Sequence, residues 1–197
     1  MPRLFAPTAT APVRLEKNHL GPKASASRQG IGRSRGGLTG KIVAIASDED
    51  TALAVEVVPG QAHDAPRLKP LLRQTVARLK PASPPDPPPV GSATEPPQKP
   101  VDQLAGDKAF GGQPQRQACA ELGVELVSLS KKSAKNPVPL DEAAYRQRNR
   151  IERLFAKLKE FRRVATRYEK LKETFLGLIH LVLGFIRLRA FHNVNRA

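Results

Sequence analysis

Two short apolar runs near the middle of the chain predict a β-hairpin. Residues 41–47 and 52–58 are rich in Val, Ile and Ala, and Asp48-Glu49-Asp50 lies between them. Three adjacent acids could suggest a metal cluster. Turns favour acidic residues because their carboxylates bond to nearby backbone N–H groups, so we interpret the three as a structural turn.

Apolar residues with helical spacing predict the next elements. One helix covers residues 66–79, with Asp64 as its N-cap. A long helix is expected over residues 141–171, with a break near Arg163, and a last apolar helix over residues 173–189.

The segment between these helices predicts strand, helix and strand. Residues 101–110 form a short strand that runs into a loop, with Asp107 near its end. Residues 113–122 form a helix stopped by Gly123, and residues 124–130 form a strand. The whole order predicts a mixed α/β fold, with helices flanking a sheet.

Two segments lack apolar periodicity. Residues 1–40 are rich in Pro, Ala, Ser, Gly and Arg, and we expect a disordered basic arm. Prolines dominate residues 81–100, which predicts a stiff linker or insertion; a proline-rich ligand for a binding module is the alternative. The expected domain is thereby divided into residues 41–80 and 101–190.

Composition narrows the class of protein. The chain has 197 residues, 33 Lys and Arg against 18 acids and a formal charge of +15, so nucleic acid is the first partner to consider. Ribosomal or membrane-surface binding stays open from charge alone. Cys119 is the only cysteine, which excludes a disulfide framework and a cysteine zinc site. The four histidines are scattered without ligand spacing.

The chain is expected to be cytosolic. Prolines at positions 2, 7 and 12 interrupt the N-terminus, and no signal peptide is visible. The apolar run 175–186 is twelve residues long and contains His180, so we interpret it as a buried helix that is too short to span a bilayer.

The stretch 145–163 carries the most information. Ile151, Leu154, Phe155 and Leu158 fall on one side of a helix, and Glu152 lies at the edge of that stripe. By the helical count Arg148, Lys159 and Arg163 surround this acid. A nucleic-acid-cutting metal site would need such an arrangement, and an ordinary solvated helix face would also produce it.

Several runs, in order, resemble one family. They are Ile31-Gly-Arg-Ser-Arg-Gly-Gly-Leu-Thr39, Lys41-Ile42, Pro59-Gly-Gln-Ala-His-Asp64, Asp107-Lys-Ala-Phe110, Tyr145-Arg-Gln-Arg-Asn-Arg-Ile-Glu-Arg-Leu-Phe155 and Lys159-Glu-Phe-Arg-Arg-Val-Ala-Thr-Arg-Tyr-Glu-Lys170. Together they resemble bacterial insertion-sequence transposases of the DDE type, whose catalytic domain is ribonuclease H-like.

The resemblance implies a two-metal site acting on the ends of an insertion element. Three carboxylates hold divalent cations, usually Mg²⁺, that activate the attacking oxygen and stabilise the leaving oxygen of a phosphodiester. Asp107 would be the second acid and Glu152 the third. The cations expected to contact DNA phosphates are Arg33, Arg35, Arg148, Arg153, Lys159, Arg162 and Arg163.

The chain departs from the family at its first acid. The family carries an Asp on a strand before the hairpin, whereas residues 1–30 contain no Asp and only one acid, Glu16. We therefore expect a truncated or frameshifted copy that lacks the first strand and is catalytically defective. The missing strand would leave a central sheet position empty and the hairpin edge exposed.

Two other functions stay open. A small basic protein could coat nucleic acid without chemistry, or the chain could pair with itself or with a full-length transposase and block its assembly. All three readings place the chain in the cytoplasm with the nucleoid, and none involves a membrane.

Overall fold

Strand β4 (Gly37–Ala46) lies at the centre of the sheet. Ile42, Ala44 and Ala46 alternate with Val43 and Ile45, and all five are buried. A strand that is apolar on both faces needs cover on both sides. Strand β5 (Ala52–Pro59) runs antiparallel to β4 along one edge. The predicted hairpin is therefore confirmed.

The computed structural model describes residues 3–5, 13–14, 28–35, 37–79, 101–130 and 137–194. For residues 3–5, 13–14 and 194 it describes the main chain alone. The proline-rich segment 81–100 and most of the basic loop after residue 130 lie outside the described residues.

The strand expected to be missing is present. Strand β1 (Arg3–Phe5) pairs antiparallel with β4, Phe5 opposite Ala46, and parallel with β6 (Gln103–Ala105). Strand β7 (Glu125–Val127) pairs parallel with β6, so the main order is β5-β4-β1-β6-β7. The prediction of an empty central position is wrong, because three residues between prolines are too few for a periodic signal.

The expectation of disorder over residues 1–40 is also wrong where these residues are described. Strand β2 (Val13–Arg14) and strand β3 (Gly32–Ser34) both pair antiparallel with the first part of β4. Thr39 is opposite Arg14 on one side and Gly32 on the other. A Gly- and Arg-rich sequence has low β propensity. Here pairing with β4 forms the strands in spite of that low propensity.

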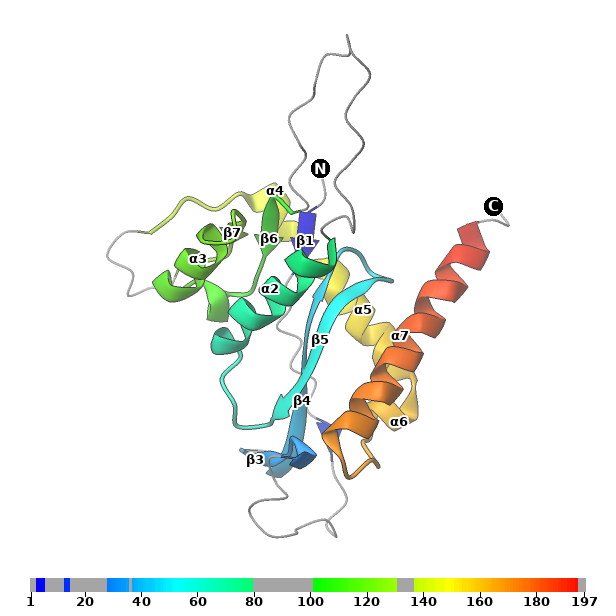
Figure 1. The fold of residues 1–197 in the computed structure, drawn as a ribbon. Coiled ribbons are helices and arrows are strands. Elements are labelled where there is room, and N and C mark those ends of the chain that lie inside the picture. The colour runs from blue at the N-terminus through cyan, green and yellow to red at the C-terminus, as the bar shows by residue number, and fades with distance from the viewer. Residues whose placement is uncertain are drawn as a thin grey trace.

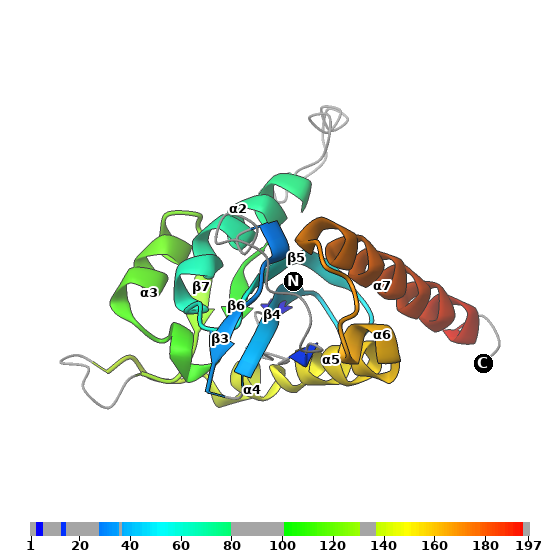
Figure 2. The same cartoon turned by 90° about the horizontal axis from the view of Figure 1, so that it is seen from below.

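Helices α2 (Leu68–Leu79) and α3 (Gln113–Ala120) cover one face of the sheet (Figure 2). Their apolar side chains pack with Val43, Ile45, Leu104 and Leu126. The short 3₁₀ turns η1 (Ala65–Arg67) and η2 (Lys108–Phe110) precede them. Gly123 follows α3 at φ 71°, as its predicted stop requires.

In the described part of the chain after β7 there are four helices: α4 (Glu142–Arg146), α5 (Asn149–Glu160), α6 (Arg162–Ala165) and α7 (Lys172–Val194). The helix predicted over residues 141–171 is thus interrupted twice. Phe161, in an extended conformation, ends α5 two residues before the expected break at Arg163. Helices α5 and α7 pack on the face opposite α2 and α3 (Figure 1).

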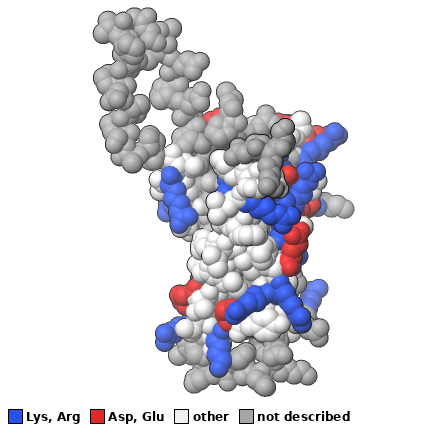
Figure 3. Space-filling view, turned by 90° about the vertical axis from the view of Figure 1, so that its right-hand side faces the viewer, with Lys and Arg blue, Asp and Glu red and all other residues white. Residues whose placement is uncertain are grey.

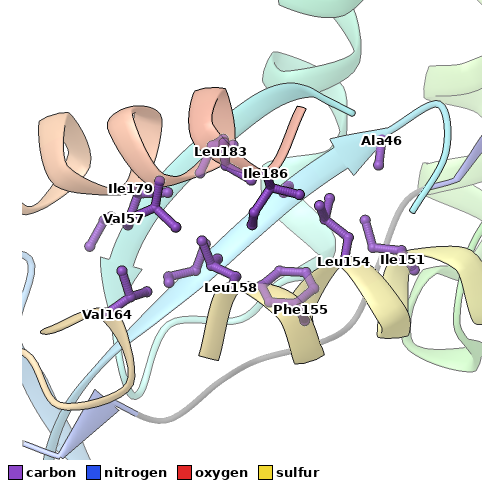
Figure 4. Packing of buried hydrophobic residues seen from close by; sticks show 14 of the residues in the cluster. Ala46, Val57, Ile151, Leu154, Phe155, Leu158, Val164, Ile179, Leu183 and Ile186 are labelled. Carbon is purple, nitrogen blue, oxygen red and sulfur yellow. The ribbon is translucent and has the colours of Figure 1, made fainter. Parts of the chain in front are cut away.

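The predicted apolar stripe of α5 is confirmed. Ile151, Leu154, Phe155 and Leu158 are buried against β4, β5 and α7, with Ile151 and Leu154 toward Ala46 (Figure 4). From α7, Ile179, Leu183 and Ile186 complete this core. Burial of one such side chain contributes about 1.5–3 kcal/mol.

The last helix is less buried than predicted. Leu181 and Leu188 of α7 are 71% and 70% exposed. By length and composition its segment Lys172–Asn193 could cross a membrane, with mean hydropathy 1.6, and only 22% of the apolar window is buried. Core helices of soluble proteins pass the same test, so this alone is weak evidence. The predicted helix over residues 173–189 is confirmed and extends from Lys172 to Val194, but the expectation that it is buried holds for one side only.

Candidate active site

Asp107 lies at the carboxyl end of β6 and is held by its neighbours. Its Oδ1 accepts a hydrogen bond of 2.6 Å from the backbone N–H of Lys108 and caps η2. The buried Ser128 hydroxyl donates to the Asp107 carbonyl oxygen at 2.8 Å. These bonds fix the residue where parallel strands end, the usual place for a ligand site in a sheet of this kind.

The segments after β6 and β7 pack closely, and Gly111 makes this possible. A Cβ at this position would collide with the carbonyl oxygen of Leu129. Arg116 of α3 donates to the carbonyl oxygens of Leu126 at 3.0 Å and Ser128 at 2.7 Å. Asp107 therefore rests on a braced support, which a catalytic ligand requires.

The alternation of β6 assigns Asp107 a face of the sheet. Ala105 packs in the cluster that contains Ile151 of α5, whereas Leu104 packs in the cluster of α2 and α3. The Gly106 N–H continues the pairing to the Val127 carbonyl oxygen at 2.9 Å, and Asp107 is extended. Asp107 is two residues beyond Ala105, and its position therefore corresponds to the α5 side.

Glu152 is in the first turn of α5. Its Oε1 forms a 2.7 Å ion pair with Arg148, and its side chain is 48% exposed. The helix N-terminus favours a carboxylate there. The guanidinium of Arg148 also lies 5.6 Å from the ring centre of Tyr145. Asp107 follows a strand of the sheet, and Glu152 lies on a helix that packs on the face to which the position of Asp107 corresponds. In the described structure the Asp107 carboxylate bonds to Lys108 and the Glu152 carboxylate pairs with Arg148, rather than with each other's surroundings.

The candidate DNA-contacting cations fall into two groups. Arg153 pairs with Glu49 at 2.9 Å and Arg163 with Glu169 at 2.8 Å, so acids already balance their charges. Arg148 belongs with them, since it pairs with Glu152. The second group consists of exposed cations for which the described residues show no ion pair: Arg33, Arg35, Lys159 and Arg162.

Two expectations about charged residues need correction. Arg163 is not beside Glu152 as the helical count indicated, because the extended Phe161 separates α6 from α5. Asp64 precedes η1 as predicted, but its side chain makes no cap bond. It pairs instead with Lys41 at 3.3 Å.

Sequence reasoning missed Arg167, which is 1% exposed. Its guanidinium donates to backbone carbonyl oxygens of Gln29, Glu169 and Lys170 and lies 4.6 Å from the ring centre of Phe175. Burial lowers the pKa of Arg167 to about 10, and neighbouring Glu169 and Glu173 oppose that shift. An arginine in a basic stretch carries no sequence signal of burial, since surface and core arginines look alike there.

Comparison with known proteins assigns the family. Residues 104–189 match a family model described as a transposase DDE domain. A putative transposase for insertion sequence element IS6501 from Brucella ovis is 33% identical over 92 residues, which are 46% of this chain and 71% of that protein. The chain belongs to the DDE transposases of insertion sequences. Transposases act on DNA, and members of this family are normally soluble and cytoplasmic.

The family match includes both candidate acids and the cations of α5 and α6. DDE transposase domains typically use a divalent metal ion. Within the described part of the chain, no group of three or more His, Cys, Asp or Glu side chains could hold a metal. The described donors of this transposase therefore do not fit a complete two-metal centre.

Proposed function

We propose that this transposase has a ribonuclease H-like catalytic domain that binds element DNA but is defective in strand cleavage. The sheet order β5-β4-β1-β6-β7, with β1 antiparallel to β4 and parallel to β6, supports the fold assignment. Helices on both faces agree with it.

The observation that carries the proposed defect is the sequence of β1. The resemblance assigns the first catalytic Asp to a strand before the hairpin, and β1 stands there with the sequence Arg3-Leu4-Phe5. Glu16 is the one acid among residues 1–30. The basis of the defect is therefore a strand without its acid, rather than the missing strand first expected.

Asp107 and Glu152 are the two acids we propose to remain. Hard carboxylate oxygens suit Mg²⁺, which keeps water and phosphate oxygens in its shell. When bound, the metal would supply Lewis-acid stabilisation of phosphate charge. Ser128 would keep Asp107 in place, and Arg148 would set the position of Glu152. Loss of one carboxylate removes charge and geometry together, so cation affinity should be weak.

DNA binding is proposed to use exposed cations of α5 and α6 and of the segment that contains β3. The candidates are Lys159, Arg162, Arg33 and Arg35, with Arg148 beside Glu152. Arg153 and Arg163 are proposed as weaker contributors because each has an acidic partner. Sequence preference for element ends and association with the nucleoid form part of the same proposal.

The test combines binding with cleavage. The full chain is incubated with a duplex carrying the element's terminal repeat, in Mg²⁺ or Mn²⁺. We expect salt-sensitive binding with no cleavage above background. Robust nicking that is lost in Asp107→Asn and Glu152→Gln would overturn the proposed defect.

Cation binding gives an independent measurement. Titration with Mn²⁺, followed by water-proton relaxation, should show one weak site that Asp107→Asn removes. Asp102→Asn is the matched control, since it changes an acid at the other end of β6. Absence of Mn²⁺ binding, or binding that Asp107→Asn leaves unchanged, would favour the alternative, a basic nucleic-acid-binding protein without a metal site at Asp107.

A further inference from the structure

Helix α7 has an apolar face that the other described elements of this chain leave exposed. Its buried residues are Phe175, Ile179, Val182, Leu183 and Ile186. At 100° per residue, a second row lies about 180° away from them. We call this row the α7 stripe, and its members are Gly177, Leu181, Gly184 and Leu188.

The α7 stripe lies in a broad uncharged surface. Leu181 and Leu188 are about 70% exposed, and Phe185 and Phe191 beside them are 52% and 58% exposed. Figure 3 shows the α7 side of the molecule as an uncharged band with Lys and Arg gathered toward its ends. The four exposed side chains present roughly 500 Å², near the upper end for the largest patch on a monomer.

We propose that two copies of this chain pair through their α7 stripes, with the helices antiparallel. Small and large residues alternate along the stripe. An antiparallel arrangement about a point midway between Leu181 and Gly184 sets each leucine opposite a glycine. Leu181 then meets Gly184 of the second copy, and Leu188 meets Gly177 of the second copy.

The glycines leave room for these leucines. A Cβ built at Gly177 or Gly184 meets nothing within 4 Å. Glycine in a helix interior costs about 0.5–1 kcal/mol relative to alanine, and this chain accepts that cost twice on one face. Leucines that enter glycine gaps bring two helices close together, as ridges and grooves do in packed helices.

Charge and area fit the same arrangement. The stripe itself carries no charged residue, although the chain carries +15. The two helix dipoles oppose each other in this arrangement. Two patches of roughly 500 Å² give about 1,000 Å² in total, the lower limit for a specific interface.

The first experiment exchanges the large and small residues. Sedimentation of the full chain at tens of micromolar should give a dimer, and Gly184→Leu should weaken association at least tenfold. The double variant Leu181→Gly with Gly184→Leu should restore association, because a leucine again faces a glycine. Ala156→Leu on the exposed side of α5 is the control for added bulk and should sediment like the original chain.

Folding is checked separately. Gly184→Leu adds a better helix former where there is space, so its circular dichroism and melting should match or exceed the original. A monomeric original chain at these concentrations would overturn the proposal, as would unchanged association of a folded Gly184→Leu variant. Failure of the double variant to associate would also overturn it.

The second experiment tests the direction of the helices. Under mild oxidation, a mixture of Gly177→Cys and Leu188→Cys chains should form the mixed disulfide. Disulfides between identical variants would indicate parallel helices and overturn the arrangement. Cys119 does not interfere because it is fully buried.

A membrane is the competing occupant of this face. Flotation with vesicles of neutral and anionic phospholipid separates the two. We expect the dimer to stay with the protein fraction. Binding to neutral vesicles that is lost in Leu181→Lys, without a dimer in solution, would overturn the proposal. None of these measurements depends on DNA cleavage, so the result is independent of the proposed function.

Discussion

Arg148 and Glu152 form a 2.7 Å ion pair across the first turn of α5. The pair joins a proposed phosphate-binding cation to a proposed metal-binding acid. It is half exposed on the acid side, and exposed pairs of this spacing stabilise a helix by only about 0.3–0.5 kcal/mol. Its importance is therefore expected in function rather than in folding.

The first prediction concerns Glu152→Gln. The free energy of unfolding should change by no more than about 0.5 kcal/mol, because only a surface ion pair is lost. Urea denaturation followed by circular dichroism measures this. A loss of about 2 kcal/mol or more would mean that Glu152 has a structural role and would weaken its assignment as a ligand.

The second prediction separates the α5 and α6 cations by their partners. Arg162→Gln should lower DNA affinity and reduce the slope of log affinity against log salt by about 1, as expected for one lost phosphate contact. Arg153→Gln should have a smaller effect, since Glu49 already balances that charge. Fluorescence-anisotropy titrations measure the affinities. Equal losses of affinity in Arg162→Gln and Arg153→Gln would contradict the prediction and would show that the Arg153–Glu49 pair opens on DNA.

The third prediction concerns Arg167→Met. This change leaves the carbonyl oxygens of Gln29, Glu169 and Lys170 without their donor, so stability should fall by about 2–4 kcal/mol. Thermal melting measures the loss. Arg162→Met is the control, because Arg162 is exposed, and it should melt within a few degrees of the original chain. Similar melting of both variants would contradict the anchoring role.

The fourth prediction uses the single cysteine. Burial raises the pKa of the Cys119 thiol from 9.0 to about 11, with Arg116 slightly opposing the shift. The unfolded chain then loses this proton first, so the contribution to stability is present below pH 9 and is lost as pH rises through about 11. Cys119→Ala should show a weaker fall in stability over this range.

Thiol labelling tests the same environment directly. A disulfide reagent at pH 8 should label native Cys119 only as fast as the protein unfolds, because the thiolate is the reactive form. Rapid labelling of the folded chain would contradict the burial of this side chain.

The fifth prediction concerns glycines around Asp107. Gly111→Ala should destabilise the chain by about 1–3 kcal/mol, because the new Cβ overlaps the Leu129 carbonyl oxygen. Gly106→Ala is the matched control, since its Cβ would make ordinary contacts at 3.5 Å or more. Equal stability of the two variants would show that the loop moves freely.

Much of the fold could be predicted from periodicity. The hairpin, α2, α3, the stripe of α5 and the position of α7 follow from local patterns that cover seven or more residues. The three-residue strands β1 and β3 escaped prediction, because their pairing depends on partners distant in sequence. The break between α4 and α5 also escaped prediction, whereas the break expected near Arg163 lies two residues earlier, at the extended Phe161.

The candidate site was only partly accessible from sequence. The motifs with Asp107 and Glu152 suggested the acids, and the family match includes both. The support of Asp107 was not visible, because Ser128 and Arg116 join segments more than nine residues apart. Arg153, Arg162 and Arg163 are all exposed, and nothing local shows that Arg153 and Arg163 pair with acids.

The sequence by itself determined the class of fold, the cationic character and the absence of Asp from the first 30 residues. These depend on composition and on patterns within single elements. The tertiary structure alone decided that β1 fills the place between β4 and β6, that Arg167 is buried, and that α7 keeps one apolar face exposed. Each of these depends on which distant segments meet, and pairing and burial are properties of the assembled chain.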